Sequence, residues 1–140
     1  MYDTITVSRQ LKAAGVHPTA QRIAIYHYLL SQAKHPTVED IKAWVDQNFP
    51  KMSLATVYNT LRTFVEAKLV KELKLPHSSK TVYDTNVRNH HHFFDEDSGE
   101  LIDLDPAVVT LDPALKRKYL ITHIHVLLRG TQRRKYDDHA

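Results

Sequence analysis

Three consecutive histidines, His90, His91 and His92, stand near the middle of the chain. Six carboxylates follow closely: Asp95, Glu96, Asp97, Glu100, Asp103 and Asp105. Imidazole nitrogens together with carboxylate oxygens suit Fe(II), Mn(II) or Zn(II), and histidine is also a haem ligand. A purification tag would normally lie at a terminus, whereas this run is internal. The cluster therefore predicts a metal or haem site, and a solvated polar loop is the main alternative.

Strand geometry would divide these histidines between two faces. If residues 90–94 are extended, His90 and His92 point to one side and His91 to the other. Asp103, on the next predicted strand, could then join His90 and His92 across a hairpin. One short stretch could supply two different sites.

The composition limits the chemistry further. There is no cysteine, which removes disulfides, thiolate catalysis and cysteine-rich zinc sites. A 2-His-1-carboxylate oxygenase or a metal hydrolase would use similar ligands. However, HExxH, a nucleotide-binding loop and a recognisable Ser-His-Asp arrangement are all missing, and 140 residues leave little room for a substrate cavity. We therefore expect a protein that is not an enzyme, and a small metal-dependent enzyme is the minor alternative.

The first 75 residues are predicted to be mainly helical, with capping residues between the helices. A short helix is predicted over residues 4–14, and polar caps at Thr19, Thr37 and Ser53 predict three more helix starts. Thr37 and Asp40 have the spacing of a capping box. The segments "LVKELKL" and "KTVYDT" follow, separated by the turn-forming "PHSS", and they predict two antiparallel strands. Helices followed by a hairpin are typical of a winged helix-turn-helix.

The predicted helix over residues 53–67 has the two faces of a DNA recognition helix. Its apolar stripe would face inward, while Tyr58, Asn59 and Arg62 could reach base edges or phosphates. The net charge of +3 adds only weak support. The predicted DNA-binding residues are Lys12, Arg22, Thr56, Tyr58, Asn59 and Arg62.

From about residue 86 the pattern becomes that of a small α/β unit. "HHFFD" and "ELIDL" predict two strands joined by a turn at residues 97–99, and residues 106–118 predict a helix broken at Pro113. Alternation over residues 119–130 predicts a further strand. We thus expect an α+β protein with domains over residues 1–85 and 86–140.

No signal-peptide core or apolar run long enough to span a bilayer is seen, so we expect a cytoplasmic protein without a membrane partner.

The segments "HPTVEDI", "SLATVYNTLRTF", "VYDTN", "HHHFF" and "GELIDL" occur in the order and spacing of the ferric uptake regulator (Fur) superfamily. The chain resembles this family from about residue 8 to residue 130. Within it, the consecutive histidines and the lack of cysteine are most similar to the iron response regulator branch, and the peroxide-sensing branch is a near neighbour. The resemblance implies a bacterial homodimeric repressor that binds double-stranded operator DNA through an N-terminal winged helix and dimerises through a C-terminal α/β domain.

The resemblance also implies the ligands. A regulatory site that joins the two domains would use His35, Asp84, His90, His92 and Asp103. A second metal or haem site would use His91 and His123 with Asp112, or with Asp105 as another candidate. Asp103 stands where iron-uptake regulators usually have glutamate and matches the peroxide-sensing pattern.

Two departures from the family are informative. Asp95 and Ser98 stand where relatives have the CxxC of a structural zinc, so no cysteine-type zinc is expected and the acidic Asp95–Asp97 segment is predicted to be a solvated turn. Asn59 replaces a common arginine, which suggests a different operator.

The function implied is a metal- or haem-responsive transcriptional regulator of iron homeostasis, with the sign of regulation left open. A peroxide-sensing repressor that uses oxidation of His35 or His90 is the alternative.

Overall fold

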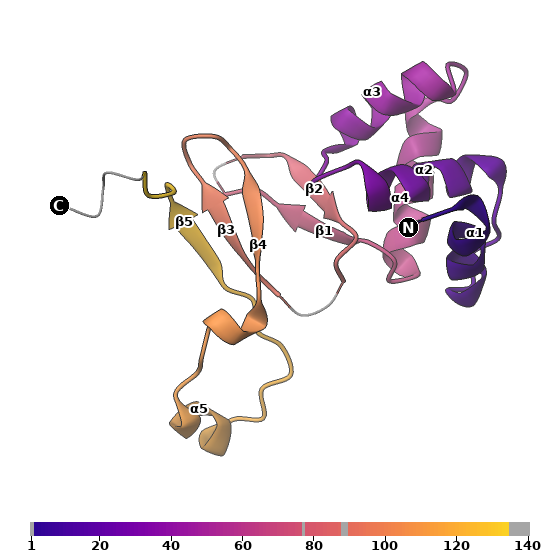
Figure 1. Ribbon diagram of the computed structural model, residues 1–140. Coiled ribbons are helices and arrows are strands. Elements are labelled where there is room, and N and C mark those ends of the chain that lie inside the picture. Colours follow the sequence, from indigo (N-terminus) through magenta and orange to yellow (C-terminus); the bar gives the residue numbers. More distant parts are fainter. Residues whose placement is uncertain (1, 77, 88–89, 135–140) are drawn as a thin grey trace. The chain divides into compact units, whose positions relative to one another are not determined.

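The structure is a computed structural model that describes residues 2–76, 78–87 and 90–134 (Figure 1). The chain divides into two compact units, Met1–Val87 and Arg88–Ala140. The first unit is helical with a two-stranded hairpin, and the second contains a three-stranded sheet. Among the described residues, no helix has both the length and the apolar character needed to span a bilayer.

Four helices build most of the first unit: α1 (Thr4–Ala13), α2 (Ala20–Ser31), α3 (Val38–Asn48) and α4 (Leu54–Glu66). The side chains of Thr19, Thr37 and Ser53 each accept a hydrogen bond from the backbone N–H three residues on, which satisfies a donor that the first helical turn leaves without a partner. The side-chain carboxylate of Asp40 accepts the backbone N–H of Thr37 and completes the capping box. The predicted helix starts are therefore confirmed.

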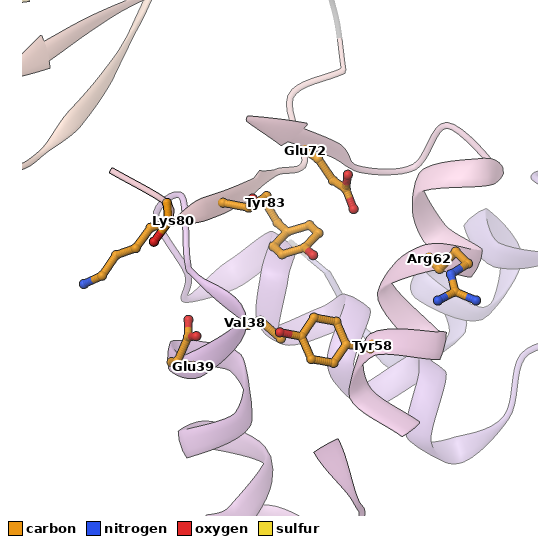
Figure 2. Close-up of a pocket in the computed structure, with 9 residues that line it drawn as sticks. Val38, Glu39, Tyr58, Arg62, Glu72, Lys80 and Tyr83 are labelled. Carbon is orange, nitrogen blue, oxygen red and sulfur yellow. The ribbon is translucent and has the colours of Figure 1, made fainter. Parts of the chain in front are cut away.

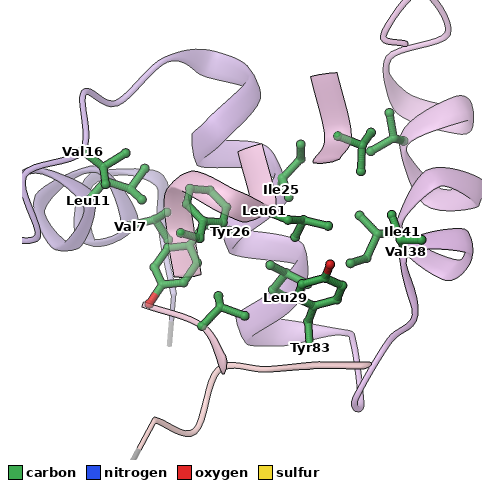
Figure 3. Close-up of a cluster of buried hydrophobic side chains, with 14 of the residues drawn as sticks. Val7, Leu11, Val16, Ile25, Tyr26, Leu29, Val38, Ile41, Leu61 and Tyr83 are labelled. Atoms are coloured by element: carbon green, nitrogen blue, oxygen red, sulfur yellow. The ribbon is translucent and has the colours of Figure 1, made fainter. Parts of the chain in front are cut away.

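The core of the first unit lies between these helices (Figure 3). Val57, Leu61 and Phe64 of α4 are almost fully buried, as their spacing along one helical face predicts. The ring of Phe64 packs against Tyr26 of α2, with 5.4 Å between the ring centroids. Packing of this face fixes α4 and leaves its opposite face to solvent.

The hairpin of the first unit consists of β1 (Lys71–Lys74) and β2 (Thr81–Asp84), which pair antiparallel as predicted. Its expected turn includes residue 77, which lies outside the described residues. β2 also joins the segment before α3: Thr37 bridges Val82, and the N–H of Tyr83 donates to the carbonyl of Pro36 over 2.9 Å. The hairpin is thus tied to the start of α3, and the unit has the element order of a winged helix-turn-helix.

The second unit has a sheet with the strand order β4-β3-β5. β3 (His91–Asp95) is central, β4 (Leu101–Leu104) pairs with it antiparallel, and β5 (Leu127–Gly130) pairs with it parallel. A 3₁₀ turn, η1 (Pro106–Val108), and a short helix, α5 (Pro113–Lys118), lie in the connection between β4 and β5. The predicted α+β fold, a winged helix-turn-helix followed by a small α/β unit, is therefore confirmed.

Two details of the second unit differ from expectation. The broken helix is confirmed, but Pro113 begins α5 instead of interrupting a helix, since the first helical turn needs no N–H there. The strand predicted over residues 119–130 is wrong before Leu127. The carbonyl of Val126 still accepts the N–H of His92 over 3.1 Å, but the N–H of Val126 donates to Nδ1 of His91 over 2.9 Å and not to the backbone of β3.

Candidate metal centre and DNA-binding face

In the first unit, His35 and Asp84 form a pair of potential ligands. Nε2 of His35 lies 3.3 Å from Oδ2 of Asp84, and Oδ1 of Asp84 accepts the N–H of Asn86 over 2.9 Å. The tie between β2 and the segment before α3 brings the two residues together. His35 has φ 42°, in the left-handed region that is unfavourable for a residue with a Cβ. This backbone conformation is held in place by the surrounding structure.

In the second unit, His90, His92 and Asp103 form a three-residue group. Nε2 of His92 lies 3.2 Å from Oδ1 of Asp103, and Nε2 of His90 lies 3.3 Å from the same oxygen. The register of the β3–β4 hairpin places His92 directly opposite Asp103. Both imidazoles are buried, and their rings are 4.5 Å apart. One hairpin thus gathers two nitrogen donors around one carboxylate.

This set of donors fits a divalent cation of the first transition row. Two imidazole nitrogens that converge on a carboxylate oxygen match the ligand preferences of Mn(II), Fe(II) and Zn(II). The His35–Asp84 pair offers the same two kinds of donor. The five residues that the family resemblance implies are therefore distributed as one pair in the first unit and one group of three in the second.

His125 was not predicted from the sequence. Its Nε2 lies 3.0 Å from Nδ1 of His92, and the two rings meet edge to face. In a strand over residues 119–130, alternation would put both His123 and His125 on the same side. However, only the parallel pairing of β5 with β3 shows which of the two meets His92.

The residues predicted for a second metal or haem site are arranged differently. His91 is buried, and its Nδ1 accepts the N–H of Val126, so a neutral His91 ring carries its proton on Nε2. Asp112 caps α5 through the N–H of Ala114, Asp105 caps η1, and His123 is exposed. In the described part of the chain, none of these four belongs to a group of three or more potential metal ligands.

The exposed face of α4 carries three of the predicted DNA-binding residues. Tyr58, Asn59 and Arg62 are exposed, whereas the hydroxyl of Thr56 is close to that of Ser53 at the helix start. Lys12 is exposed on α1. The guanidinium of Arg22 donates to the carbonyl of His17 over 3.0 Å and so supports the loop before α2.

Tyr58 and Arg62 also face the hairpin across a hollow of about 380 Å³ (Figure 2). Tyr83 of β2 and Glu72 of β1 line the same hollow. Burial, and then the neighbouring Glu72 carboxylate, raise the pKa of Tyr83 to about 12. Tyr83 therefore stays protonated over the working pH range.

Asp95 corrects the prediction of a solvated acidic turn. It is 5% exposed, and Oδ1 accepts the N–H groups of Asp97 and Ser98 over 2.9 and 3.3 Å. Its Oδ2 accepts the side-chain amide of Gln132 over 3.1 Å. The rest of the segment is exposed. Asp95 thus ties the β3–β4 turn to the chain that follows β5.

Replacing Asp95 by alanine should lower the melting temperature by several degrees, because three N–H groups lose their acceptor. The Gln132 amide, followed by the turn N–H groups, holds the pKa of Asp95 below its usual 3.8. A lowered pKa stabilises the fold at neutral pH, and this stabilisation is lost as the pH falls through 3.8 and below. Circular dichroism melts should therefore show a difference from the wild type that shrinks in acid. The control is the exposed Asp97→Ala, and an equal loss in both variants would contradict this role.

The chain is similar in sequence and in fold to known proteins. The sequence model of the Ferric uptake regulator family matches residues 13–128. The chain is 43% identical over 93 residues to the peroxide-responsive repressor PerR of Staphylococcus aureus (strain USA300). The aligned segment spans 66% of this chain and 62% of the length of that protein. PerR from Streptococcus pyogenes, a peroxide-sensing gene regulator, has a similar structure, with TM-score 0.54 and 30% identity over 94% of this chain and 92% of that one. The ferric uptake regulator of Helicobacter pylori has the same fold, with TM-score 0.74 and 18% identity over 94% and 93% of the two chains.

Proposed function

This chain belongs to the ferric uptake regulator family, and we therefore propose that it is a metal-responsive, DNA-binding transcriptional regulator of iron homeostasis. Residues 1–85 would bind operator DNA, and residues 86–140 would dimerise and sense the ligand. The protein would act in the cytoplasm and would catalyse no reaction. The sensed ligand would be Fe(II), Mn(II) or Zn(II), with haem as an alternative ligand of the histidine run.

The observation that carries this proposal is the convergence of His90 and His92 on one oxygen of Asp103. Two buried imidazoles beside a half-exposed carboxylate are costly to desolvate, and a bound cation would offset that cost. The cation would supply positive charge that holds several donors in one arrangement. We propose that His35 and Asp84 bind the same ion and complete the set of five.

The chain's own residues would convert this binding into regulation. If the five donors share one ion, binding favours the arrangement in which all five meet, by no more than the difference in affinity between the arrangements. In a two-fold dimer that arrangement sets the spacing of the two α4 helices. Tyr58, Asn59 and Arg62 would then contact base edges and phosphates at two half-sites of the operator.

The test is metal-dependent DNA binding. Manganese-loaded protein should select a subset of sequences from a pool of random DNA duplexes. In a gel-shift assay, the protein should bind the selected duplex only when Mn²⁺ is present. Tyr58→Ala and Arg62→Ala should each weaken binding by roughly 5- to 100-fold, which corresponds to about 1–3 kcal/mol for a base-edge contact. Lys42→Ala on α3 is the control for loss of one surface charge. Binding that is equally tight in Tyr58→Ala, Arg62→Ala and wild type would contradict the assignment of α4.

Peroxide sensing is the second candidate function. It is favoured by Asp103, which matches the peroxide-sensing pattern, and by the 43% identity to PerR of S. aureus. Protein loaded with Fe(II) and treated with peroxide should then gain the mass of one oxygen atom on the peptide that contains His35 or His90. Mn(II)-loaded protein is the control, and unmodified peptides after Fe(II) and peroxide would leave iron homeostasis as the better proposal.

A further inference from the structure

Both ring nitrogens of His92 have a neighbour within the second unit. Nε2 lies 3.2 Å from Oδ1 of Asp103, and Nδ1 lies 3.0 Å from Nε2 of His125. His92 is only 2% exposed, whereas His125 is exposed to solvent. The buried ligand is thus connected to water through a second histidine.

The geometry separates the roles of these two neighbours. The in-plane lone pairs of Nδ1 and Nε2 point away from each other across the imidazole ring. An ion bound at Nε2 beside Asp103 would therefore lie on the opposite side of His92 from His125. His125 is placed to hold His92 and not to bind the same ion.

A cation at Nε2 would leave Nδ1 as the nitrogen of His92 that carries the ring proton, because a neutral imidazole has one N–H. Nδ1–H would then donate to Nε2 of His125, which lies 3.0 Å away. The contact between the two rings therefore suits the form of His92 that would bind a metal.

The backbone holds His125 at this position. The N–H of the next residue, Val126, donates to Nδ1 of His91, and the carbonyl of Val126 accepts the N–H of His92 over 3.1 Å. Both bonds connect Val126 to β3, next to His92. The contact between the two imidazoles is therefore preorganised by the sheet.

We propose that His125 is a positioning residue: through its contact with Nδ1 it holds the ring of His92 in the orientation that presents Nε2 beside Asp103, where the metal would bind. This inference rests on the proposed function, since it takes His92 as a ligand. It assigns to His125 a role that the ligand pattern of the sequence did not contain.

The experiment is calorimetric titration of the tag-free full-length protein with Mn²⁺, together with ¹⁵N NMR of the histidine rings. His125→Ala should weaken Mn²⁺ binding by about 10- to 100-fold, the range for loss of a partner behind a ligating histidine, with unchanged stoichiometry. His125→Gln, whose amide can accept or donate at a similar distance, should recover most of this loss. His17→Ala is the control for loss of an exposed imidazole. In the metal-free protein, the ¹⁵N chemical shift of His92 Nδ1 should differ between wild type and His125→Ala, because the variant lacks the hydrogen-bond partner of Nδ1.

The outcomes separate this inference from the proposed function. If His92→Ala binds Mn²⁺ as well as wild type, the proposed metal site itself is wrong. If His92→Ala weakens binding but His125→Ala binds as wild type and leaves the ¹⁵N shifts of His92 unchanged, only the role of His125 is wrong. If His125→Ala loses the bound ion as completely as His92→Ala, and glutamine does not recover it, His125 is a direct ligand and the positioning role is overturned.

Discussion

Replacing Asp103 by alanine is expected to weaken Mn²⁺ binding more than any other single change in the second unit. Oδ1 of Asp103 is the point on which His90 and His92 converge, at 3.3 and 3.2 Å. Without it, the second unit supplies only imidazole donors, and oxygen donors are the ones that Mn²⁺ prefers. The loss should exceed the roughly 10- to 100-fold that follows removal of an outer partner. Calorimetric titration of purified protein would measure it.

The same variant should discriminate between metals. Zn²⁺ binds imidazole more strongly than Mn²⁺ does, so Asp103→Ala should lose less affinity for Zn²⁺ than for Mn²⁺. Glu100→Ala is a matched control, because it removes an exposed carboxylate just before the same strand. A drop of less than tenfold for Mn²⁺, or an equal drop in the control, would show that Asp103 is not a ligand.

Replacing Phe64 by alanine is expected to have the largest effect on stability. Phe64 is fully buried in α4 and packs against Tyr26. Truncation leaves a cavity and removes apolar contacts, which costs about 3–5 kcal/mol in the free energy of unfolding. The total free energy of unfolding of a small domain is only about 5–15 kcal/mol. A larger fraction of the variant should therefore be unfolded, and α4 should present Tyr58 and Arg62 less often. Urea denaturation followed by circular dichroism would measure the change.

Two further variants make this prediction specific. Phe64→Leu keeps most of the buried volume and should cost clearly less than the alanine change. Leu54→Ala removes a side chain that is 46% exposed on the same helix and should change the free energy of unfolding by less than about 0.5–1 kcal/mol. Equal losses in Phe64→Ala and Leu54→Ala would mean that the core drawn in Figure 3 is not what stabilises α4.

The features that sequence reasoning recovered are local. A cap such as Ser53 depends on the three residues that follow it, and the separation of His91 from His90 and His92 depends only on strand alternation. The convergence on Asp103 needed one further step, the pairing of two strands joined by a short turn. Such contacts are set within a few residues, so patterns in the sequence carry them.

The features that were missed depend on β5, which is more than 30 residues away from β3 in the chain. Its parallel register decides that His125 meets His92, and the side chain of His91 accepts the N–H of Val126 just before β5 begins at Leu127. The burial of Asp95 likewise depends on Gln132. No local pattern encodes a side chain that competes with the backbone ladder, which explains the overlong strand prediction.

The left-handed backbone of His35 has an evolutionary consequence. Glycine adopts φ 42° at little cost, whereas histidine does so against steric resistance, so this position trades conformational ease for an imidazole. Selection for folding alone would favour glycine or asparagine there. A descendant that no longer responds to metal should therefore drift toward those residues at position 35, and a retained histidine would mark a lineage in which sensing is still under selection.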